Sequence, residues 1–277
     1  MTRIEWWTRE YICSNGVCEK TKFPVQVDGE QSARTGRNYK RGIRRWEKNA
    51  NEAKHEAART ANNNFRAGRD HLLTVTVSEE GYDELVLRAG TNDSDVLLMQ
   101  LRKEIANWIR RAKRLMKKSG EDQLKYIAFP SDRDGKTMQP VQLHAHVLVN
   151  AEAVEAMAAS WKLGFVFGAD KKLYSKHHGD LTDLVEYLMD QTRQVGTEKR
   201  YIPSRNLDKP KASRPRPVKN PDARLRVPKG ASLIFYSEQR AGRPQKIRYY
   251  RPEEDQGRAD QHVPDESCLQ RGGSESE

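Results

Sequence analysis

Apolar and polar residues alternate most regularly in the segment VQLHAHVLVN at 141–150. Its apolar residues occupy every second position, at Val141, Leu143, Ala145, Val147 and Val149. Successive side chains of a β-strand point to opposite faces, so Gln142, His144 and His146 share the other face. The pattern therefore predicts a strand with one apolar face and two neighbouring imidazoles on the opposite face.

The same analysis predicts a core of alternating strands and helices around this segment. The expected strands lie at 71–77, 124–129 and 163–168, and the expected helices at 95–118, 151–161 and 181–192. Helix 95–118 has the clearest stripe, with apolar residues at steps of three and four. Asp93 or Ser94 can cap its start, Gly120 can end it, and Asp180 can cap helix 181–192. The core order is thus β-α-β-β-α-β-α.

This order predicts an α+β fold with an antiparallel sheet, helices on one face and the other face left for a substrate. The core spans 70–200. Residues 1–69 form a basic N-terminal extension with a helix at about 44–62 and a possible small β element before it. Residues 201–251 form a basic, Pro-rich arm with a possible hairpin at 232–237 and 246–251. Residues 252–277 are acidic and are expected to be disordered.

Charge is unevenly distributed along the chain, whose formal net charge is +11. Residues 199–248 carry 15 Lys and Arg against 3 Asp and Glu, and residues 34–70 carry 11 against 4. The last 27 residues reverse the balance, with 3 against 8. Two basic segments that flank a mixed core are typical of a protein that binds a polyanion such as nucleic acid.

Cysteine use and hydropathy restrict the cellular setting. The 3 cysteines provide neither a second pair for a zinc site nor a disulfide framework, so we expect a reducing cytoplasm. The N-terminal residues lack a long apolar run, so we expect no signal peptide and no membrane segment. A GxxxxGK[ST] run is absent from the sequence, so we expect no helicase domain in this chain.

The histidine strand can hold a divalent metal ion. Neutral imidazole is a common ligand, and a His-x-His pair on a strand offers two ligands at a nearly fixed separation. Gln142 shares their face, and Asp132 lies in the preceding turn, so either side chain can add an oxygen ligand. The alternative is that His144 and His146 are plain surface residues of a sheet with one solvated face.

Tyr187 lies at the margin of the apolar stripe of helix 181–192. Its ring can simply pack there, or its hydroxyl can point at the sheet face. A phenol is a poor nucleophile at its free pKa of about 10. A metal ion that neutralises charge on a phosphate would let this tyrosine attack a phosphodiester and keep the product as a phosphotyrosine ester.

The ordered segments LHAHVLVN, WKLGFVF, DLVEYL and RYIPSRNLDKP resemble the HUH endonucleases that initiate rolling-circle replication, above all the bacterial and phage type. HLLTVTV at 71–77 is similar to the family's first strand motif, and the likeness runs from about Ile4 to Arg251. It implies a ferredoxin-like or RRM-like core, Mg²⁺ or Mn²⁺ held by His144 and His146, and Tyr187 as the nucleophile. It also implies single-stranded DNA at a replication origin as substrate, with a host helicase and polymerase as partners.

Two departures from the family pattern stand out. The family often has a lysine three residues after the tyrosine and then a glutamate, whereas this chain has Asp190 and Gln191. Arg193 is near enough in sequence to replace that lysine. A glutamate that acts as a third ligand in relatives corresponds to a position near Ser131, which is why Asp132 and Gln142 are the candidates here.

Cations that track a DNA backbone, together with aromatic rings that stack on bases, are expected in the basic segments. The candidates are Arg44, Arg45, Trp46, Arg193, Lys199, Arg200, Tyr201 and Arg205. Each can equally belong to a solvated charge cluster. Three other functions remain open: a relaxase or transposase of the same chemistry, a non-catalytic nucleic-acid-binding module with an RRM-like sheet, and a structural DNA-coating protein.

Overall fold

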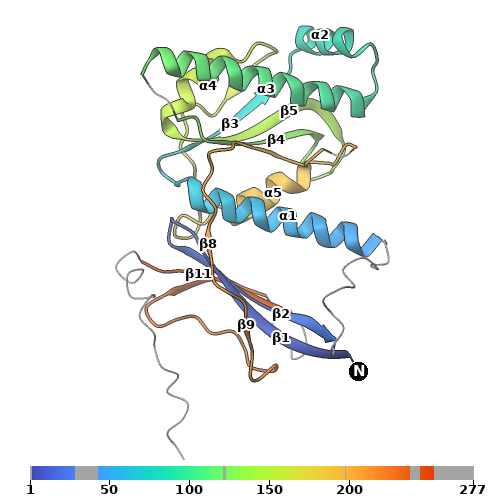
Figure 1. The fold of residues 1–277 in the computed structure, drawn as a ribbon. Coiled ribbons are helices and arrows are strands. Elements are labelled where there is room, and N and C mark those ends of the chain that lie inside the picture. Colours follow the sequence, from blue (N-terminus) through green and yellow to red (C-terminus); the bar gives the residue numbers. More distant parts are fainter. Residues whose placement is uncertain (1, 29–42, 121–122, 197, 238–243, 253–277) are drawn as a thin grey trace, which may run out of the picture.

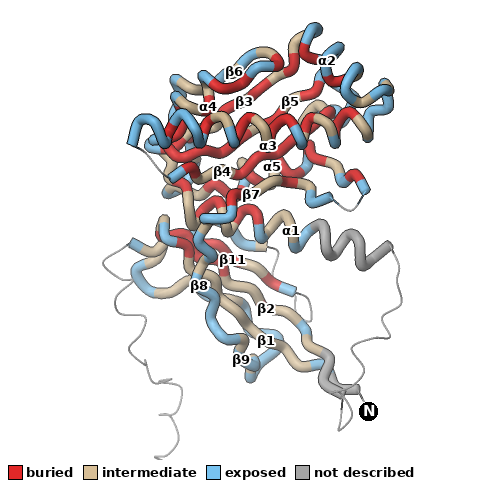
Figure 2. Tube along the Cα trace, turned by 45° about the horizontal axis from the view of Figure 1, so that its top comes forward, coloured by how far each residue is buried: buried red, intermediate tan, exposed pale blue. Residues whose placement is uncertain are grey.

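The computed structural model describes residues 2–28, 43–120, 123–196, 198–237 and 244–252. These residues form two antiparallel sheets, with helix α1 lying between them (Figure 1). The helices are α1 (Ile43–Asn64), α2 (Glu79–Ala89), α3 (Ser94–Lys118), α4 (Val154–Ser160), preceded by a 3-10 turn (Ala151–Ala153), and α5 (Thr182–Gln191). Most buried segments belong to the first sheet and its helices, whereas the second sheet is mainly half-buried or exposed (Figure 2).

The first sheet has five strands in the order β6-β3-β5-β4-β7. Its strands are β3 (His71–Thr76), β4 (Tyr126–Arg133), β5 (Pro140–Val149), β6 (Val166–Phe167) and β7 (Ile202–Pro203). β5 lies at the centre and pairs antiparallel with both β3 and β4, as expected for a hairpin around the 134–139 turn. Opposite His146 lie Thr74 and Phe129, and opposite His144 lie Thr76 and Ser131. The register thus places both histidines in the middle of the sheet.

Helices α2, α3 and α4 cover one face of this sheet. Every second residue of β5 points into the large apolar core there, which includes Ala145, Val147 and Val149. Trp108 of α3 anchors that core, because its ring meets Trp161 edge to face at 5.1 Å and its indole N–H donates to the Met157 carbonyl. Asp93 caps α3 as the sequence predicts, accepting hydrogen bonds from the amides of the first helical turn.

The opposite face is covered in part by helices, which corrects the expectation that all helices lie on one side. α1 and α5 pack on it and bury Leu148, Ile127 and Phe129 of the sheet. The physical reason is the apolar side of α1, where Ala57, Ala58, Ala61 and Phe65 are all buried. His144 and His146 lie at the margin of this cover: both are half-buried, and Gln191 at the end of α5 contacts His146.

The two flanks of the core form the second sheet together, rather than a separate extension and an extended arm. Its strands are β1 (Thr2–Ile12), β2 (Val17–Asp28), β8 (Lys211–Ala212), β9 (Arg216–Pro217), β10 (Ser232–Tyr236) and β11 (Gln245–Tyr250). The order is β10-β11-β2-β1-β8, with β9 also paired to β1. The expected late hairpin is confirmed by the β10–β11 pairing, and a small core around Cys18, Ile247 and Tyr249 supports it.

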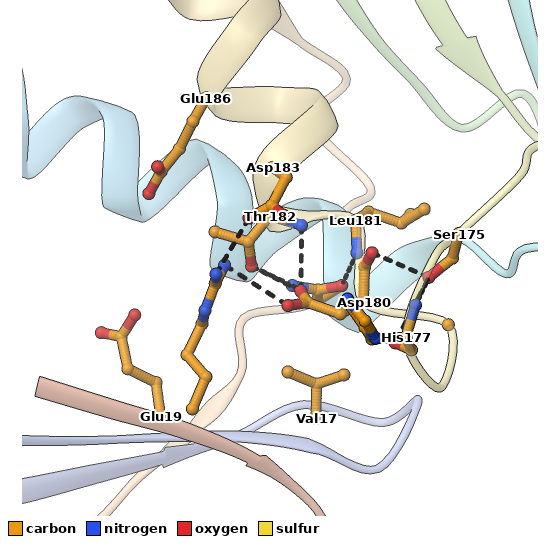
Figure 3. A network of polar contacts seen from close by, with 12 residues as sticks. Val17, Glu19, Ser175, His177, Asp180, Leu181, Thr182, Asp183 and Glu186 are labelled. Carbon is orange, nitrogen blue, oxygen red and sulfur yellow. Dashed lines mark hydrogen bonds and ion pairs between the residues drawn. The ribbon is translucent and has the colours of Figure 1, made fainter. Parts of the chain in front are cut away.

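Buried charges join the second sheet to α1 and α5. The Glu19 carboxylate on β2 contacts Arg59 of α1 and lies 3.1 Å from the Lys246 ammonium on β11. Arg248 on β11 pairs with Asp180 and Asp183 at the start of α5 (Figure 3). Buried ion pairs need such multiple partners to offset their desolvation, so this joint requires both flanks of the chain at once.

Several elements differ from the sequence prediction. α2 was not expected, since its segment is short and mostly polar, yet Ser78 caps it and Gly90 ends it in a left-handed conformation. The predicted helix at 151–161 is a 3-10 turn followed by α4, and the strand at 163–168 is only two residues long. The acidic tail at 253–277 lies outside the described residues. Among the described helices, none is long and apolar enough to cross a membrane.

The joint at Glu19 predicts a stability effect. Burial alone would raise the pKa of Glu19, but Lys246 and Arg59 outweigh it and hold the pKa below its ordinary value of 4.5. The charged carboxylate therefore stabilises the fold at neutral pH, and this contribution is lost as the pH falls through the lowered pKa. We expect Glu19→Gln to lower the free energy of unfolding by about 3 kcal/mol at pH 7, because it leaves buried cations unpaired.

Urea denaturation of both proteins at pH 7 and in acid measures the effect. The difference between wild type and Glu19→Gln should shrink as the pH falls. Glu84→Gln is the control, since Glu84 forms an exposed pair with Arg88 within α2 and should change stability by about 0.5 kcal/mol or less. An equal effect of the two variants would contradict the role of the joint.

Candidate active site

His144 and His146 lie side by side on the face of the first sheet that α1 and α5 cover in part. Their ring centroids are 5.1 Å apart, with the ring planes inclined at 79°. Neither ring is turned into the apolar core, because the intervening Ala145 takes that side. The geometry matches the sequence prediction that both imidazoles share a face, and His146 is the more buried of the two.

Hydrogen bonds orient both rings. His144 Nδ1 donates to the backbone carbonyl of Gln142 at 2.9 Å, which leaves Nε2 with a lone pair. His146 Nδ1 bonds to the Thr74 hydroxyl at 2.9 Å across the β3–β5 pair. Metal-binding histidines commonly use one ring nitrogen in this way to fix the tautomer for the other. Each ring is thus held in one orientation by a hydrogen bond at Nδ1.

The charge state of His146 suits the same role. Burial, as the largest cause, and the neighbouring His144 lower its pKa to about 4, although a hydrogen bond that the imidazole donates to the Gln191 side chain offsets part of the shift. Since the pKa lies well below 7, the ring is neutral at neutral pH. Neutral imidazole is the form that coordinates a metal ion.

Tyr187 extends from α5 toward the turn between β4 and β5. A Cβ atom placed on Gly135 of that turn would lie 2.4 Å from the Tyr187 hydroxyl and 2.7 Å from the Gln191 amide nitrogen. Both side chains therefore touch the turn backbone, while 46% of Tyr187 stays exposed. The hydroxyl end of the ring is thus held at the turn, while the residue as a whole is partly exposed to solvent.

Gln191 connects the tyrosine to the histidine pair. It is almost fully buried, hydrogen-bonds to His146 through its side chain, and has an amide nitrogen without a hydrogen-bond partner. The Ser131 hydroxyl donates to its backbone carbonyl at 2.8 Å, which ties the last turn of α5 to β4. A buried donor without a protein partner is costly, so this amide is available to hydrogen-bond a group that enters the site.

Sequence reasoning gave Gln191 no functional role. It follows Tyr187 by four residues, and residues at this spacing lie on one side of a helix. That spacing was available as a signal, but the contact with His146 depends on how α5 lies on the sheet.

The proposed oxygen ligands separate in the structure. Gln142 lies at the exposed start of β5, where its amide nitrogen donates to the Val77 carbonyl. This hydrogen bond does not use the side-chain oxygen of Gln142. Asp132 instead gives its carboxylate to Arg193. Within the described ranges, no group of three or more His, Cys, Asp and Glu side chains is gathered so that it could hold a metal ion. Of the ligands expected from the sequence, His144, His146 and the Gln142 amide oxygen thus remain as candidates, whereas the Asp132 carboxylate is engaged by Arg193.

Three of the expected DNA contacts have structural roles instead. Arg193 pairs with Asp132 and Asp95, and the hydrogen bonds to Asp132 are the main reason that its pKa is raised. Arg200 donates to the carbonyls of Met189 and Thr192 and so caps the end of α5. Tyr201 is buried against Phe129 at 6.2 Å, and burial raises its pKa to about 12. All three side chains form contacts within the protein at or near the end of α5.

Other expected contacts stay open. Lys199 and Arg205 are exposed, as a phosphate contact requires. Arg44, Arg45 and Trp46 fall in the first turns of α1, and their side chains lie outside the described residues. At the position where the resembling family has a lysine, Asp190 accepts a hydrogen bond from Lys54 of α1 at 2.7 Å. This pair neutralises the acidic residue next to the candidate nucleophile.

Comparison with protein-family models, with curated protein sequences and with solved structures found no match for this chain.

The site predicts metal binding by the histidine pair. Mn²⁺ added to the full chain should bind with a stoichiometry of one, and His144→Ala or His146→Ala should weaken binding by about tenfold or more, because each removes one imidazole ligand. Isothermal titration calorimetry measures this directly. His177→Ala is the matched control, since His177 is exposed in the loop before α5. Equal Mn²⁺ affinity in all three variants would rule out a site at the pair.

Proposed function

We propose that this protein is a metal-dependent endonuclease and strand transferase that nicks single-stranded DNA through Tyr187. One observation carries the proposal: the Tyr187 hydroxyl and His146 both border the buried Gln191 side chain, beside the oriented pair of imidazoles. A nucleophile and two neutral ligands at one place on an accessible sheet face are the minimum that phosphoryl transfer to a tyrosine needs.

Tyr187 has the role of nucleophile. Its hydroxyl gives up its proton to water as the oxygen attacks the phosphorus of one phosphodiester, a new oxygen–phosphorus bond forms, and the bond to the 3′ oxygen breaks. The 3′ oxygen leaves as a hydroxyl after it takes up a proton, and the 5′ phosphate stays on the tyrosine. The reverse attack by a 3′ hydroxyl rejoins the strand without an added energy source, because the ester conserves the energy of the cleaved bond.

The histidines hold the cofactor in this proposal. His144 and His146, with the Gln142 oxygen, would bind Mg²⁺ or Mn²⁺, with water and phosphate oxygens in the remaining positions. When bound, the ion would supply Lewis-acid chemistry that stabilises negative charge on the scissile phosphate. The hydrogen bonds from His144 to Gln142 and between His146 and Thr74 keep the two rings in place through the reaction.

Gln191 acts as a positioning residue. Its amide nitrogen has no partner and lies near the Tyr187 hydroxyl at the Gly135 turn. An N–H donor at this place can bond to the phenol oxygen or to a phosphate oxygen, and either bond would favour the negative charge that develops during attack. The Ser131 contact to its backbone keeps the donor fixed.

The biological role follows from charge and from the motif order. The basic flanks suit a DNA partner, and the resemblance to HUH initiators favours an origin strand as the target, with rolling-circle replication of a plasmid, phage or mobile element as the process. Host helicase and polymerase would then extend the freed 3′ end. Reduced Cys13 and Cys18 are compatible with action in the cytoplasm.

A second candidate is a non-catalytic sheet that binds single-stranded nucleic acid. The exposed rings of Phe165 and Phe167 on the same sheet favour it, since RRM-like modules bind through such rings. The two functions differ in one outcome, because only the enzyme leaves a protein–DNA adduct.

The nucleophile is tested by an adduct assay. Wild-type protein incubated with Mn²⁺ and a labelled pool of random single-stranded oligonucleotides should give a covalent adduct on a denaturing gel. Tyr187→Phe should abolish the adduct, because it removes the attacking oxygen. Tyr174→Phe is the matched control, since Tyr174 is highly exposed in the loop after β6 and should leave adduct formation unchanged. An adduct that survives Tyr187→Phe would assign the nucleophile to another residue.

The Gly135 turn gives a second test. Gly135→Ala places a methyl group against the Tyr187 hydroxyl and the Gln191 amide, so the phenol must shift. We expect adduct formation to slow by about 10–100-fold, since small displacements of a nucleophile are costly. Mn²⁺ affinity should stay unchanged, because the histidines are not displaced. Met138→Ala, an exposed position in the same turn, is the control and should retain the wild-type rate.

A further inference from the structure

The edge strand β6 presents two aromatic rings to solvent. Phe165 and Phe167 are 63% and 55% exposed, and their ring centroids are 6.5 Å apart with a tilt of 44°. Val166 between them packs against the apolar core under α2, α3 and α4. The alternation of the strand therefore turns both phenylalanines to the opposite face, which is the face of the histidines.

The rings lie in line with the candidate active site. Phe167 pairs with Thr74, which pairs in turn with His146, so the three residues form one row across the sheet. The Thr76 amide donates to the Phe165 carbonyl, and Thr76 pairs with His144. Two neighbouring rows of the sheet thus run from an aromatic ring at the edge to an imidazole at the centre.

The backbone holds this strand tightly against β3. A Cβ on Gly164 would lie 2.4 Å from the Thr76 carbonyl oxygen, and one on Gly168 would lie 2.4 Å from the Leu72 carbonyl oxygen. Only glycine allows so close an approach at both ends. The Trp161 indole N–H also donates to the Thr76 carbonyl at 3.0 Å. The two rings are thus presented by a fixed segment rather than by a loose loop.

We propose that Phe165 and Phe167 stack on bases of the single strand whose phosphate reaches the histidines. The choice of DNA as the occupant rests on the proposed function, on the continuity of the rows with the active site, and on the +11 charge of the chain. Exposed rings that border a polar site are typical of a binding surface, and stacking is tolerant of sequence because every base has a π face. The platform orients nucleotides that flank the cut site.

Binding of two labelled probes to the full chain tests the platform. One probe is fluorescein-labelled oligo(dT), and the other is a strand of equal length made of abasic sugar-phosphate units. Phe165→Leu and Phe167→Leu should each weaken oligo(dT) binding by roughly tenfold, and the double variant by roughly a hundredfold. Affinity for the abasic probe should change less than about twofold, because phosphate contacts are unaltered.

Tyr82→Leu is the matched control, since Tyr82 is an exposed ring on α2, on the opposite side of the sheet. Circular dichroism confirms that the leucine variants fold. Three outcomes overturn the platform: no binding of oligo(dT) by wild type, unchanged binding by the double variant, or an equal loss on the abasic probe or in Tyr82→Leu.

The adduct assay separates this proposal from the nicking reaction. Loss of oligo(dT) binding in the ring variants, together with no adduct in wild type, supports the platform and rejects the enzyme. An adduct in wild type with unchanged binding by the ring variants supports the enzyme and rejects the platform.

Discussion

The central constraint on this protein is that one face of β5 changes from apolar to polar side chains along the strand. The other face of the strand is apolar from Leu143 to Val149 and is buried under α2, α3 and α4. On the second face, Leu148 is buried under α1 and α5, whereas His146 and His144, at the next two positions, are only half-buried. An apolar residue must be buried and an imidazole needs polar partners, which here are Thr74 and the last residue of α5, Gln191, for His146, and the Gln142 carbonyl for His144. Every part of the candidate site lies along this boundary.

α1 is the element that makes the two sheets into one structure. Its alanines and Phe65 lie against the first sheet, and its other side carries Arg59, which pairs with Glu19 of the second sheet. Small residues on one side of α1 allow the helix to approach the first sheet closely. The Arg59 side chain on its other side can form an ion pair with the second sheet only if its partner there is held in place. The N-terminal hairpin and the late β10–β11 hairpin supply that partner together, so segments more than two hundred residues apart in sequence stabilise the same joint.

Several cationic and aromatic residues near α5 were expected from the sequence to contact DNA, yet in the structure they form contacts within the protein. Arg193 and Arg200 satisfy carboxylates and helix-end carbonyls, which are groups that would be costly to bury unpaired. Tyr201 fills space against Phe129. Phe165 and Phe167 do reach solvent, on the same sheet face as the histidines. They lie in a short edge segment in which Val166 packs against the core, and this packing turns both rings to the other face. Local composition therefore does not tell which members of the basic segments form internal contacts, and it did not single out these exposed rings.

Much of the core order was predictable because alternation and helical periodicity act over a few residues, and strand 141–150, helix 95–118 and helix 181–192 all carry strong patterns. The shared face of His144 and His146 follows from that local rule alone. Three features were decided only in the tertiary structure. They are the partial cover of the second face by α1 and α5, the single sheet formed by the two flanks, and the placement of Gln191 between Tyr187 and His146. These features depend on contacts between distant segments, and period and composition carry no information about which distant surface a residue will meet.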